Sequence, residues 1–384
     1  MKFWDTTEDK GFDYDKSRSE LISNLDMISA MDVKEQTLYK KWVEFNEDLH
    51  TSYKRLPVLQ SYYDNLWAPT DLSDYNQTIK EIQDLDPIVE ITEDTTTWTD
   101  IRKLIHTMDF TANPGRNVKI FIKDRNTGKV LGLISLGSDI TSLGVRDQFI
   151  GWTKEDKFTN GKLNNTCIAT TIVPTQPLGY NFVGGKLIAA LCTSPEIRDH
   201  WKQKYDNVLI GVGTTSLYGI QSIYNGIPHF KTLGESKGMI SIKPDDKYYD
   251  VWHQYIKVKY PEKYEKAINS TGPKQNVLNM IFRELNIKTN HYNHGFKRGV
   301  FFSQMYENGN QFLCSKIEEQ DLVMKNKILK GNEYSVNWWK DKAIKRYTTL
   351  FNDNKIKPEK LFYSDVIGMQ WQECKEKYLS EVGR

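Results

Sequence analysis

The chain has 384 residues, 39% of them hydrophobic and 27% charged, and its 52 Lys and Arg nearly balance its 50 Asp and Glu. That length is ample for two or three domains with cores of their own. No apolar run is long enough to cross a membrane and no charged-then-apolar leader is visible, so we expect neither a membrane protein nor an exported one. The four cysteines lie far apart, which predicts neither a disulfide framework nor a zinc site and fits the cytoplasm.

Charge is distributed unevenly along the sequence. Residues 1–100 carry 10 Lys and Arg against 22 Asp and Glu, whereas residues 101–384 carry 42 against 28. The larger part of the chain could therefore face a polyanion such as DNA, and the first hundred residues could not easily do so. Uneven solvated charge is also common in large proteins, so charge alone leaves nucleic-acid binding open.

Residues 1–87 are predicted to form an acidic helical region. Apolar side chains recur there at helical spacing, for example at Leu21, Leu25 and Ile28, and Pro87 ends the region. We see no catalytic chemistry in it. The pattern indicates a packing element or a surface for a protein partner.

Residues 88–245 change to strand-type patterning. Alternating apolar and polar residues predict a strand, a short helix and then two strands that form a β-hairpin, at 88–94, 98–108, 117–124 and 129–138. Arg125-Asn-Thr-Gly128 supplies the turn of that hairpin. A further strand is expected near the end of the region, after the loop that begins at Tyr224.

The stretch from Cys167 to Gly219 reads as an apolar strand (167–174), a glycine-bearing loop (176–185), a helix and a second apolar strand (207–215). We interpret it as a parallel crossover, which together with the antiparallel hairpin predicts an α+β (mixed α/β) domain. The loop would end at a helix N-terminus, where free amides favour phosphate or another anion. A plain turn between a strand and a helix is the competing interpretation.

That order of elements resembles the GNAT superfamily of N-acetyltransferases, in which a loop at a helix N-terminus holds the pyrophosphate of an acyl-coenzyme A. Gln176 and Gly179 match this loop, and Asn181 stands where the superfamily has Gly or Ala. The resemblance implies a GNAT-like central mixed sheet and an acyl-coenzyme A, or another phosphate-bearing donor, as the cofactor. The residues that it places near this donor are Gln176, Gly179, Tyr180, Asn181, Gly184 and Gly185.

A closer resemblance covers about residues 130–240. It rests on 131–138 (LGLISLGS), Ile150-Gly151-Trp152, Asn164-Asn165, Pro174 at the end of the apolar strand, Asn181 opening the helix and Leu233-Gly234. These landmarks resemble the DruA-like family, which is found in phages, mobile elements and the Druantia anti-phage system. The segments 294–313 and 364–384 look like the C-terminal extension of phage-encoded members. The resemblance implies a viral or mobile-element protein of GNAT-like architecture, comparable to the phage Mom enzyme, which modifies adenine in DNA.

Residues 246–384 are predicted to be mostly helical, and 335–351 reads as a basic helix that carries aromatic residues. Such a helix can present cations to phosphates and rings to unstacked bases, although most such aromatics belong to cores. Two histidines within 291–294 lack a third ligand at fixed spacing, so we predict no metal site. The candidates for nucleic-acid contact are Lys297, Arg298, Lys342, Lys345 and Arg346.

Group transfer to an amine needs a base and hydrogen-bond donors for developing charge. The candidates near the crossover are His229, Tyr218, Tyr224 and Asn165. Each has a structural alternative, as a surface histidine, a core tyrosine or a turn-closing asparagine. The sequence contains no Gly-x-Ser-x-Gly, His-Glu-x-x-His or P-loop lysine motif.

Two functions therefore remain, and the sequence leaves open whether the chain is an enzyme. The first is a DNA-modifying transferase of a phage or mobile element, with a GNAT-like core that transfers an acyl- or carbamoylmethyl-type group to a nucleobase. The second is a non-catalytic module that binds nucleic acid or protein, for counter-defence or in the virion. The two differ in what they require of the crossover, since only the transferase needs a donor pocket there.

Overall fold

The protein is described from a computed structural model, which describes residues 12–46, 57–106, 115–216, 219–220, 224–236, 241–270, 273–288, 290–293, 297–357 and 366–382. The chain divides into two compact units. Unit 1 comprises residues 1–43, 237–297 and 371–384, and unit 2 comprises residues 44–236 and 298–370. Each unit thus joins segments that are distant in sequence, and neither coincides with one of the three consecutive regions suggested by the sequence.

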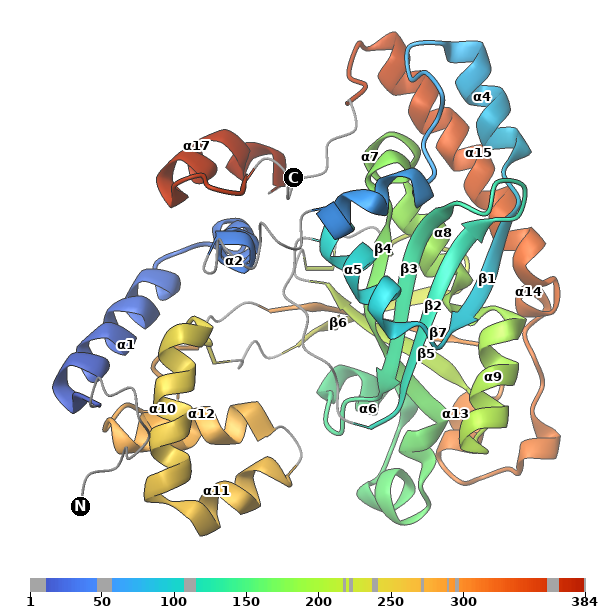
Figure 1. Cartoon of the computed structure of the whole chain (residues 1–384). Coiled ribbons are helices and arrows are strands. Elements are labelled where there is room, and N and C mark those ends of the chain that lie inside the picture. Colours follow the sequence, from blue (N-terminus) through green and yellow to red (C-terminus); the bar gives the residue numbers. More distant parts are fainter. Residues whose placement is uncertain are drawn as a thin grey trace. The chain divides into compact units, whose positions relative to one another are not determined.

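Unit 2 is built around one mixed sheet, which has seven strands within the described residues (Figure 1). The order across the sheet is β1-β2-β3-β4-β5-β7-β6; β4 and β5 are parallel, and the other neighbours are antiparallel. This sheet, with helices before and after it in the chain, confirms the α+β class with a mixed sheet. The strands are β1 (Pro87–Thr92), β2 (Asn117–Asp124), β3 (Val130–Ser138), β4 (Thr166–Pro174), β5 (Gly211–Ser216), β6 (Phe230–Glu235) and β7 (Gly299–Gln304).

The predicted hairpin of β2 and β3 is confirmed, and its turn is fixed by local chemistry. The Asp124 carboxylate accepts hydrogen bonds from the backbone N–H and the hydroxyl of Thr127, at 3.0 and 2.7 Å. Gly128 follows with a φ of 69°, in the left-handed region that glycine enters at little cost. A short polar side chain followed by glycine is the usual chemistry of a tight turn, which is why the sequence predicted it.

Helices cover both faces of the sheet (Figure 1). On one face Arg102 of α5 (Thr95–Ile105) reaches β4, where its Nε donates to the Thr171 hydroxyl at 3.4 Å. On the other face Ile188 of α8 (Gly184–Ala190) packs so tightly on Gly132 that a Cβ there would lie 2.5 Å from it. The other helices of unit 2 are α4 (Tyr75–Asp84), α6 (Gly144–Ile150), α7 (Gln176–Phe182), α9 (Pro195–Tyr205), α13 (Gly309–Leu313), α14 (Asn326–Leu329) and α15 (Gly331–Asn352).

An apolar core lies between the sheet and helices α7, α8, α9 and α15. Its largest side chains include Phe182, Trp201, Trp339 and Tyr347, and all four are fully buried. Burying one such side chain is worth about 1.5–3 kcal/mol, so this layer dominates the packing of unit 2. The indole Nε1 of Trp339 also donates to the Phe182 carbonyl at 3.0 Å. α15 is therefore held against α7, although the two helices are far apart along the chain.

Unit 1 is helical within the described residues. Its core is a separate apolar cluster that includes Leu21, Leu25, Trp252 and Phe282. The buried carboxylate of Asp245 joins its segments, since it accepts hydrogen bonds from Asn24, Tyr39 and Lys40 at 2.6–2.9 Å. The helices are α1 (Tyr14–Ser29), α2 (Val33–Asn46, whose last turn belongs to unit 2), α10 (Asp246–Lys259), α11 (Pro261–Ile268), α12 (Pro273–Glu284) and α17 (Trp371–Val382).

Three predicted elements differ from the structure. The segment 176–185, expected as a loop, is the helix α7 followed by the start of α8, so that expectation was wrong. The second crossover strand begins at Gly211 rather than at residue 207. The strand β7 lies within a region that we expected to be mostly helical. Among the described helices, none has both the length and the apolar character needed to cross a membrane.

Candidate functional site

The parallel strands β4 and β5 pair over only three residues, at their amino-terminal ends. Thr166, Cys167 and Ile168 face Gly211, Val212 and Gly213, and the register of the pair ends there. Beyond it, β4 continues beside β3 and β5 continues beside β7. A hydrogen bond from the Thr214 hydroxyl to the Ala169 carbonyl, at 3.1 Å, is the next link between the two strands. The ladder between β4 and β5 therefore ends after three residues, and we call this the β4–β5 separation. It lies toward the carboxyl ends of the two parallel strands, where ligands commonly bind.

Tyr224, a predicted catalytic residue, lies beside this separation. A hydrogen bond joins its hydroxyl to Thr214 of β5, and burial raises the pKa of Tyr224 well above its usual value of 10.0. Its ring contacts Phe301 and Phe230, with ring centroids 5.1 and 5.7 Å apart. Because the phenol stays protonated at neutral pH, Tyr224 can donate a hydrogen bond to developing negative charge but is poorly suited to act as a base.

The residues predicted to bind the phosphate-bearing donor lie on α7 and at the start of α8, directly after β4. The Gln176 side chain donates to the Ile105 carbonyl at 3.4 Å, and a Cβ added at Gly179 would lie 3.7 Å from Pro174, an ordinary van der Waals distance. Gly184 and Gly185 are buried, and a Cβ at Gly184 would lie 2.5 Å from the Leu178 carbonyl oxygen. Gly184 thus serves the close approach of α8 to α7, which is a packing requirement.

Asn181 and Tyr180 are the other two residues predicted to bind the acyl donor, and both contact Lys357. The Asn181 amide is buried; it donates to the Lys357 carbonyl at 2.8 Å and accepts from the Lys357 N–H at 3.1 Å. Tyr180 is 40% exposed. The Arg346 Cζ and the Lys357 Nζ lie 4.9 and 4.8 Å from the centre of its ring. The Asn181 side chain is therefore engaged with backbone, whereas Tyr180 lies in a cationic surface.

The basic residues predicted on the helix 335–351 extend this surface along α15. Lys342 and Lys345 are exposed and Arg346 is half-buried. Lys186 of α8 lies close enough that Lys342 adds to the effect of burial in lowering the Lys186 pKa. The Lys186 ammonium also donates to the Asn225 carbonyl at 2.6 Å, next to Tyr224. The structure thus connects the basic side of α15 with the segment that borders the β4–β5 separation.

The other predicted nucleic-acid residues, Lys297 and Arg298, belong to different units: Lys297 ends a segment of unit 1, and Arg298 begins one of unit 2. Arg298 is tied to the end of β6, since its backbone exchanges hydrogen bonds with Ser236. Burial lowers the pKa of the Arg298 guanidinium, whereas Lys297 is exposed. A mostly buried guanidinium is poorly placed to reach a phosphate, so the interface prediction has stronger support on α15.

The remaining catalytic candidates lie away from the separation or outside the described residues. Asn165 directly precedes β4. Its side-chain amide donates to the Val208 backbone carbonyl at 2.8 Å, and its backbone carbonyl accepts from the Ile210 N–H at 2.7 Å. Asn165 therefore ties together the paired ends of β4 and β5. Tyr218 lies outside the described residues.

His229 precedes β6 and lies near Tyr334 of α15, with ring centroids 6.1 Å apart. Burial, with smaller contributions from Lys327 and Lys325, lowers the pKa of His229 to about 4. The next residue, Phe230, lies opposite Ser303 of β7. Ser303 also lies opposite Val212, in the part of β5 that pairs with β4. His229 is therefore a neutral imidazole at pH 7, at the end of the sheet opposite the separation.

Sequence reasoning did not anticipate a buried ion network after β3. The Arg146 guanidinium is buried and binds the carboxylate of Asp139, while its Nη2 and Nε donate to Asp147 at 2.6 and 3.1 Å. Lys157 donates to the other oxygen of Asp147 at 2.7 Å. Residues 139–157 contain three Lys and Arg and four Asp and Glu, which was the available sequence signal, but only the fold of this segment shows which of them pair. The pairing of these four side chains indicates a structural role, although Asp139 Oδ2 is buried without a hydrogen-bond partner in the described part of the chain.

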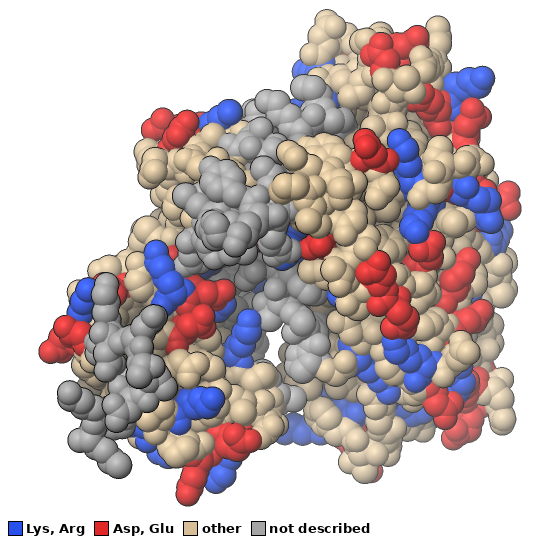
Figure 2. Space-filling model, in the orientation of Figure 1, with Lys and Arg blue, Asp and Glu red and all other residues tan. Residues whose placement is uncertain are grey.

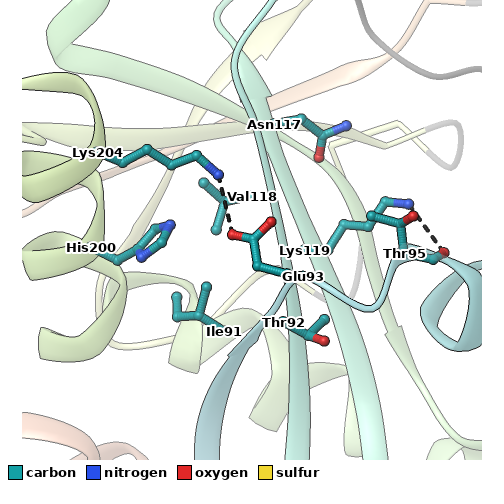
Figure 3. A pocket seen from close by; sticks show the side chains of 9 residues that line it. All are labelled: Ile91, Thr92, Glu93, Thr95, Asn117, Val118, Lys119, His200 and Lys204. Atoms are coloured by element: carbon teal, nitrogen blue, oxygen red, sulfur yellow. Dashed lines mark hydrogen bonds and ion pairs between the residues drawn. The ribbon is translucent and has the colours of Figure 1, made fainter.

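Figure 3 shows a polar cavity of about 200 Å³ between α9 and the strands β1 and β2. Glu93 and Lys204 form an ion pair across it at 3.5 Å. His200 Nε2 and Asn117 Oδ1 are buried there without a hydrogen-bond partner in the described part of the chain. Ligand pockets usually measure about 300–1,000 Å³, so this cavity is too small for a nucleotide-sized donor. In the residues that the structure describes, no three His, Cys, Asp or Glu side chains gather as metal ligands.

Comparison with known proteins decides the family. The family model for Druantia protein DruA matches residues 47–315. The chain belongs to the DruA family. A curated relative, the Druantia protein DruA of Escherichia coli (strain UMEA 4076-1), is 28% identical over 229 residues, which make up 54% of this chain and 56% of that protein. The chain therefore spans about half the length of this relative. No solved structure matches this chain.

The DruA family model covers one part of the candidate site and not the other. Residues 47–315 contain the whole sheet, α7, α8 and Tyr224. α15 lies beyond residue 315, so Lys342, Lys345 and Arg346 fall outside the matched part. The β4–β5 separation is thus part of the DruA-family segment, while the basic helix beside it comes from the following residues. The expected family is confirmed by these findings.

Proposed function

We propose that this DruA-family protein transfers a group from a phosphate-bearing donor to a nucleobase of DNA. The observation that carries the proposal is that β4 and β5 pair over three residues and then separate. A mixed sheet with one parallel pair, opened at the carboxyl ends of those strands, is what the resemblance to GNAT enzymes implies. Such an opening between strands suits the entry of an extended donor.

The residues beside the separation suggest how the donor would be held. Lys186 lies beside Tyr224, through its hydrogen bond to the Asn225 carbonyl, and we assign Lys186 to the donor's phosphates. Because Lys342 contributes to lowering the Lys186 pKa, an anion bound near the two ammonium groups would relieve their repulsion. Because Asn181 and Gly184 are engaged in packing, we assign the anion contact to side-chain cations and not to the amides of this segment.

We assign Tyr224 to the stabilisation of the transition state. In an acyl transfer the amine nitrogen of the base attacks the acyl carbon, and the leaving group departs with the electrons of the bond that breaks. The amine proton passes to water or to the departing group. Negative charge develops on the acyl oxygen. The Tyr224 phenol stays protonated because burial raises its pKa, so it can donate a hydrogen bond to that oxygen.

The test is mass spectrometry of nucleosides from the DNA of cells that express the protein, because a cell supplies every natural donor. We expect a nucleoside of new mass with the native protein and roughly 100-fold less of it with Tyr224→Phe. That factor is the usual effect of losing one hydrogen-bond donor to the transition state. The matched control is Tyr75→Phe, which also loses a tyrosine–threonine hydrogen bond, to Thr348 of α15 at 2.9 Å, in a contact between α4 and α15. Unchanged nucleosides with the native protein would contradict the proposal.

A second candidate function is a non-catalytic module that binds nucleic acid or protein. It is favoured by the position of Tyr224, whose ring packs with Phe230 and Phe301 beside β5 and fills space that a donor would otherwise use. This candidate predicts DNA binding without any new nucleoside. An origin in a phage or mobile element, and a protein partner for the acidic N-terminal region, remain predictions from the sequence.

A further inference from the structure

Tyr180 presents an aromatic ring at the surface of unit 2 between two cations. The ring is 40% exposed, although most large apolar side chains of the described chain are buried. Arg346 of α15 and Lys357 lie 4.9 and 4.8 Å from its centre. Both cations are distant from Tyr180 along the chain, so folding alone brings these three side chains together.

Several cations beside Tyr180 and along α15 have no counter-charge among the described residues. Within the described residues, four side chains have no hydrogen-bond or ion-pair partner: Lys342, Lys345, Arg346 and Lys357. The Arg346 Nε is buried and has no hydrogen-bond partner there. Residues 340–357 carry six Lys and Arg against two Asp and Glu. Unpaired cations of one sign repel each other, so this surface favours a polyanionic partner.

Cations elsewhere in the described part of unit 2 often pair with carboxylates. On the face turned to the viewer in Figure 2, Lys and Arg are interspersed with Asp and Glu, and most of the described ion pairs of unit 2 have exposed partners. A mixed surface of that kind is ordinary for a soluble domain. Within the described residues, Lys342, Lys345, Arg346 and Lys357 thus have no carboxylate partner, whereas the neighbouring Lys355 pairs with Asp353 at 3.1 Å.

An exposed ring among unpaired cations fits single-stranded nucleic acid better than duplex. Cations of this kind bind phosphates of either form. A ring adds binding energy only where a base is free to stack on it, and in a duplex the base faces are already stacked. We propose that Tyr180, Arg346, Lys357, Lys342 and Lys345 bind single-stranded DNA, with an unstacked base against the Tyr180 ring.

The proposed surface has a direct relation to the transferase site. α7 follows β4 immediately, so Tyr180 lies close after Pro174, at the end of the strand that separates from β5. An enzyme that modifies a base needs that base out of the stack. The inference therefore rests on the proposed function for its purpose, since it names the substrate as an unstacked base, while DNA binding is measurable without any transfer.

The experiment is fluorescence anisotropy of the full chain with a labelled single-stranded oligodeoxynucleotide and with the matching duplex. Loss of one base–aromatic stack typically weakens binding by about tenfold. We expect Tyr180→Ala to weaken single-strand binding by about that factor and to change duplex binding much less, while Tyr180→Phe binds as the native protein does. Circular dichroism of each variant checks that it folds.

A second pair of variants tests the cations. The double variant Lys342→Ala and Lys345→Ala should weaken the binding of both forms of DNA. The slope of log Kd against log salt for the single strand should fall by about 1.4, since each of the two lost phosphate contacts contributes about 0.7. The control is Lys129→Ala, an exposed lysine of the β2–β3 turn. A Tyr180→Ala variant that binds like the native protein, or that loses single strand and duplex equally, overturns the inference.

These outcomes are distinguishable from failure of the proposed function. Binding of single-stranded DNA that depends on Tyr180, in the absence of any new nucleoside, would sustain this surface and reject the transferase. A new nucleoside that forms equally well with Tyr180→Ala, at unchanged affinity, would sustain the transferase and reject this surface.

Discussion

Replacing Asn181 with alanine should release residues 355–357 from α7. The buried Asn181 amide makes two hydrogen bonds to the backbone of Lys357, at 2.8 and 3.1 Å. A typical intramolecular hydrogen bond contributes about 0.5–1.5 kcal/mol, so the loss of both should cost about 1–3 kcal/mol. Lys357 is half-buried, so water can replace part of what is lost. The segment would then open about 5- to 150-fold more often.

The assay is hydrogen–deuterium exchange of the full chain, read at the Lys357 amide. Faster exchange there should accompany a lower urea midpoint, and single-strand DNA affinity should fall because Lys357 no longer lies beside Tyr180. Asn181→Asp should be no better than Asn181→Ala, because a carboxylate can accept from the Lys357 N–H but repels the Lys357 carbonyl.

Two results would refute this reasoning. Unchanged protection of the Lys357 amide in Asn181→Ala would mean that the two hydrogen bonds contribute little. Loss of DNA modification in Asn181→Ala with intact Lys357 protection would mean that Asn181 contacts the donor, as the resemblance to GNAT enzymes implied, and that its contact with Lys357 is incidental.

Three further predictions concern stability, each measured as a shift in the urea midpoint. Asn165→Ala should lose about 1–3 kcal/mol, because the Val208 carbonyl loses its buried donor, without loss of DNA affinity. Gly184→Ala should destabilise the chain, since its Cβ would lie 2.5 Å from the Leu178 carbonyl oxygen, and an unshifted midpoint would contradict that close contact. The pKa of His229 is about 4 in the folded protein and 6.5 ordinarily, so the unfolded chain binds more protons between these values. Stability should therefore fall as the pH drops from about 6.5 to about 4, and His229→Gln should remove that part of the pH dependence.

Sequence patterns predicted the elements whose cause is local. The alternation in 117–124 and 130–138 and the turn chemistry at Asp124 and Gly128 specify a hairpin within one short stretch of chain, and the hairpin is present. The apolar strand 167–174 and a parallel partner after the intervening helices were also predicted correctly. The DruA-family landmarks, which depend on spacing along the chain, likewise identified the family.

Some local predictions failed because a pattern admits two structures. Gln176 to Phe182 contains a glycine and a proline, which favoured a loop. Proline is tolerated in the first turn of a helix, and packing of Leu178 and Phe182 into the core outweighs the cost of Gly179. The strand β7 was missed because the pairing that makes it a strand lies with β5 and β6, far from it in sequence.

By itself the sequence determined the fold class, the crossover and the family of this protein, because those depend on periodicity and spacing within short stretches. The tertiary structure alone decided what the candidate residues do. Asn181 meets a partner that is remote in sequence and so serves packing, while Tyr180, next to it, is turned toward Arg346 and Lys357 at the surface. No local pattern can assign such contacts, because they exist only once the core has brought α15 against α7.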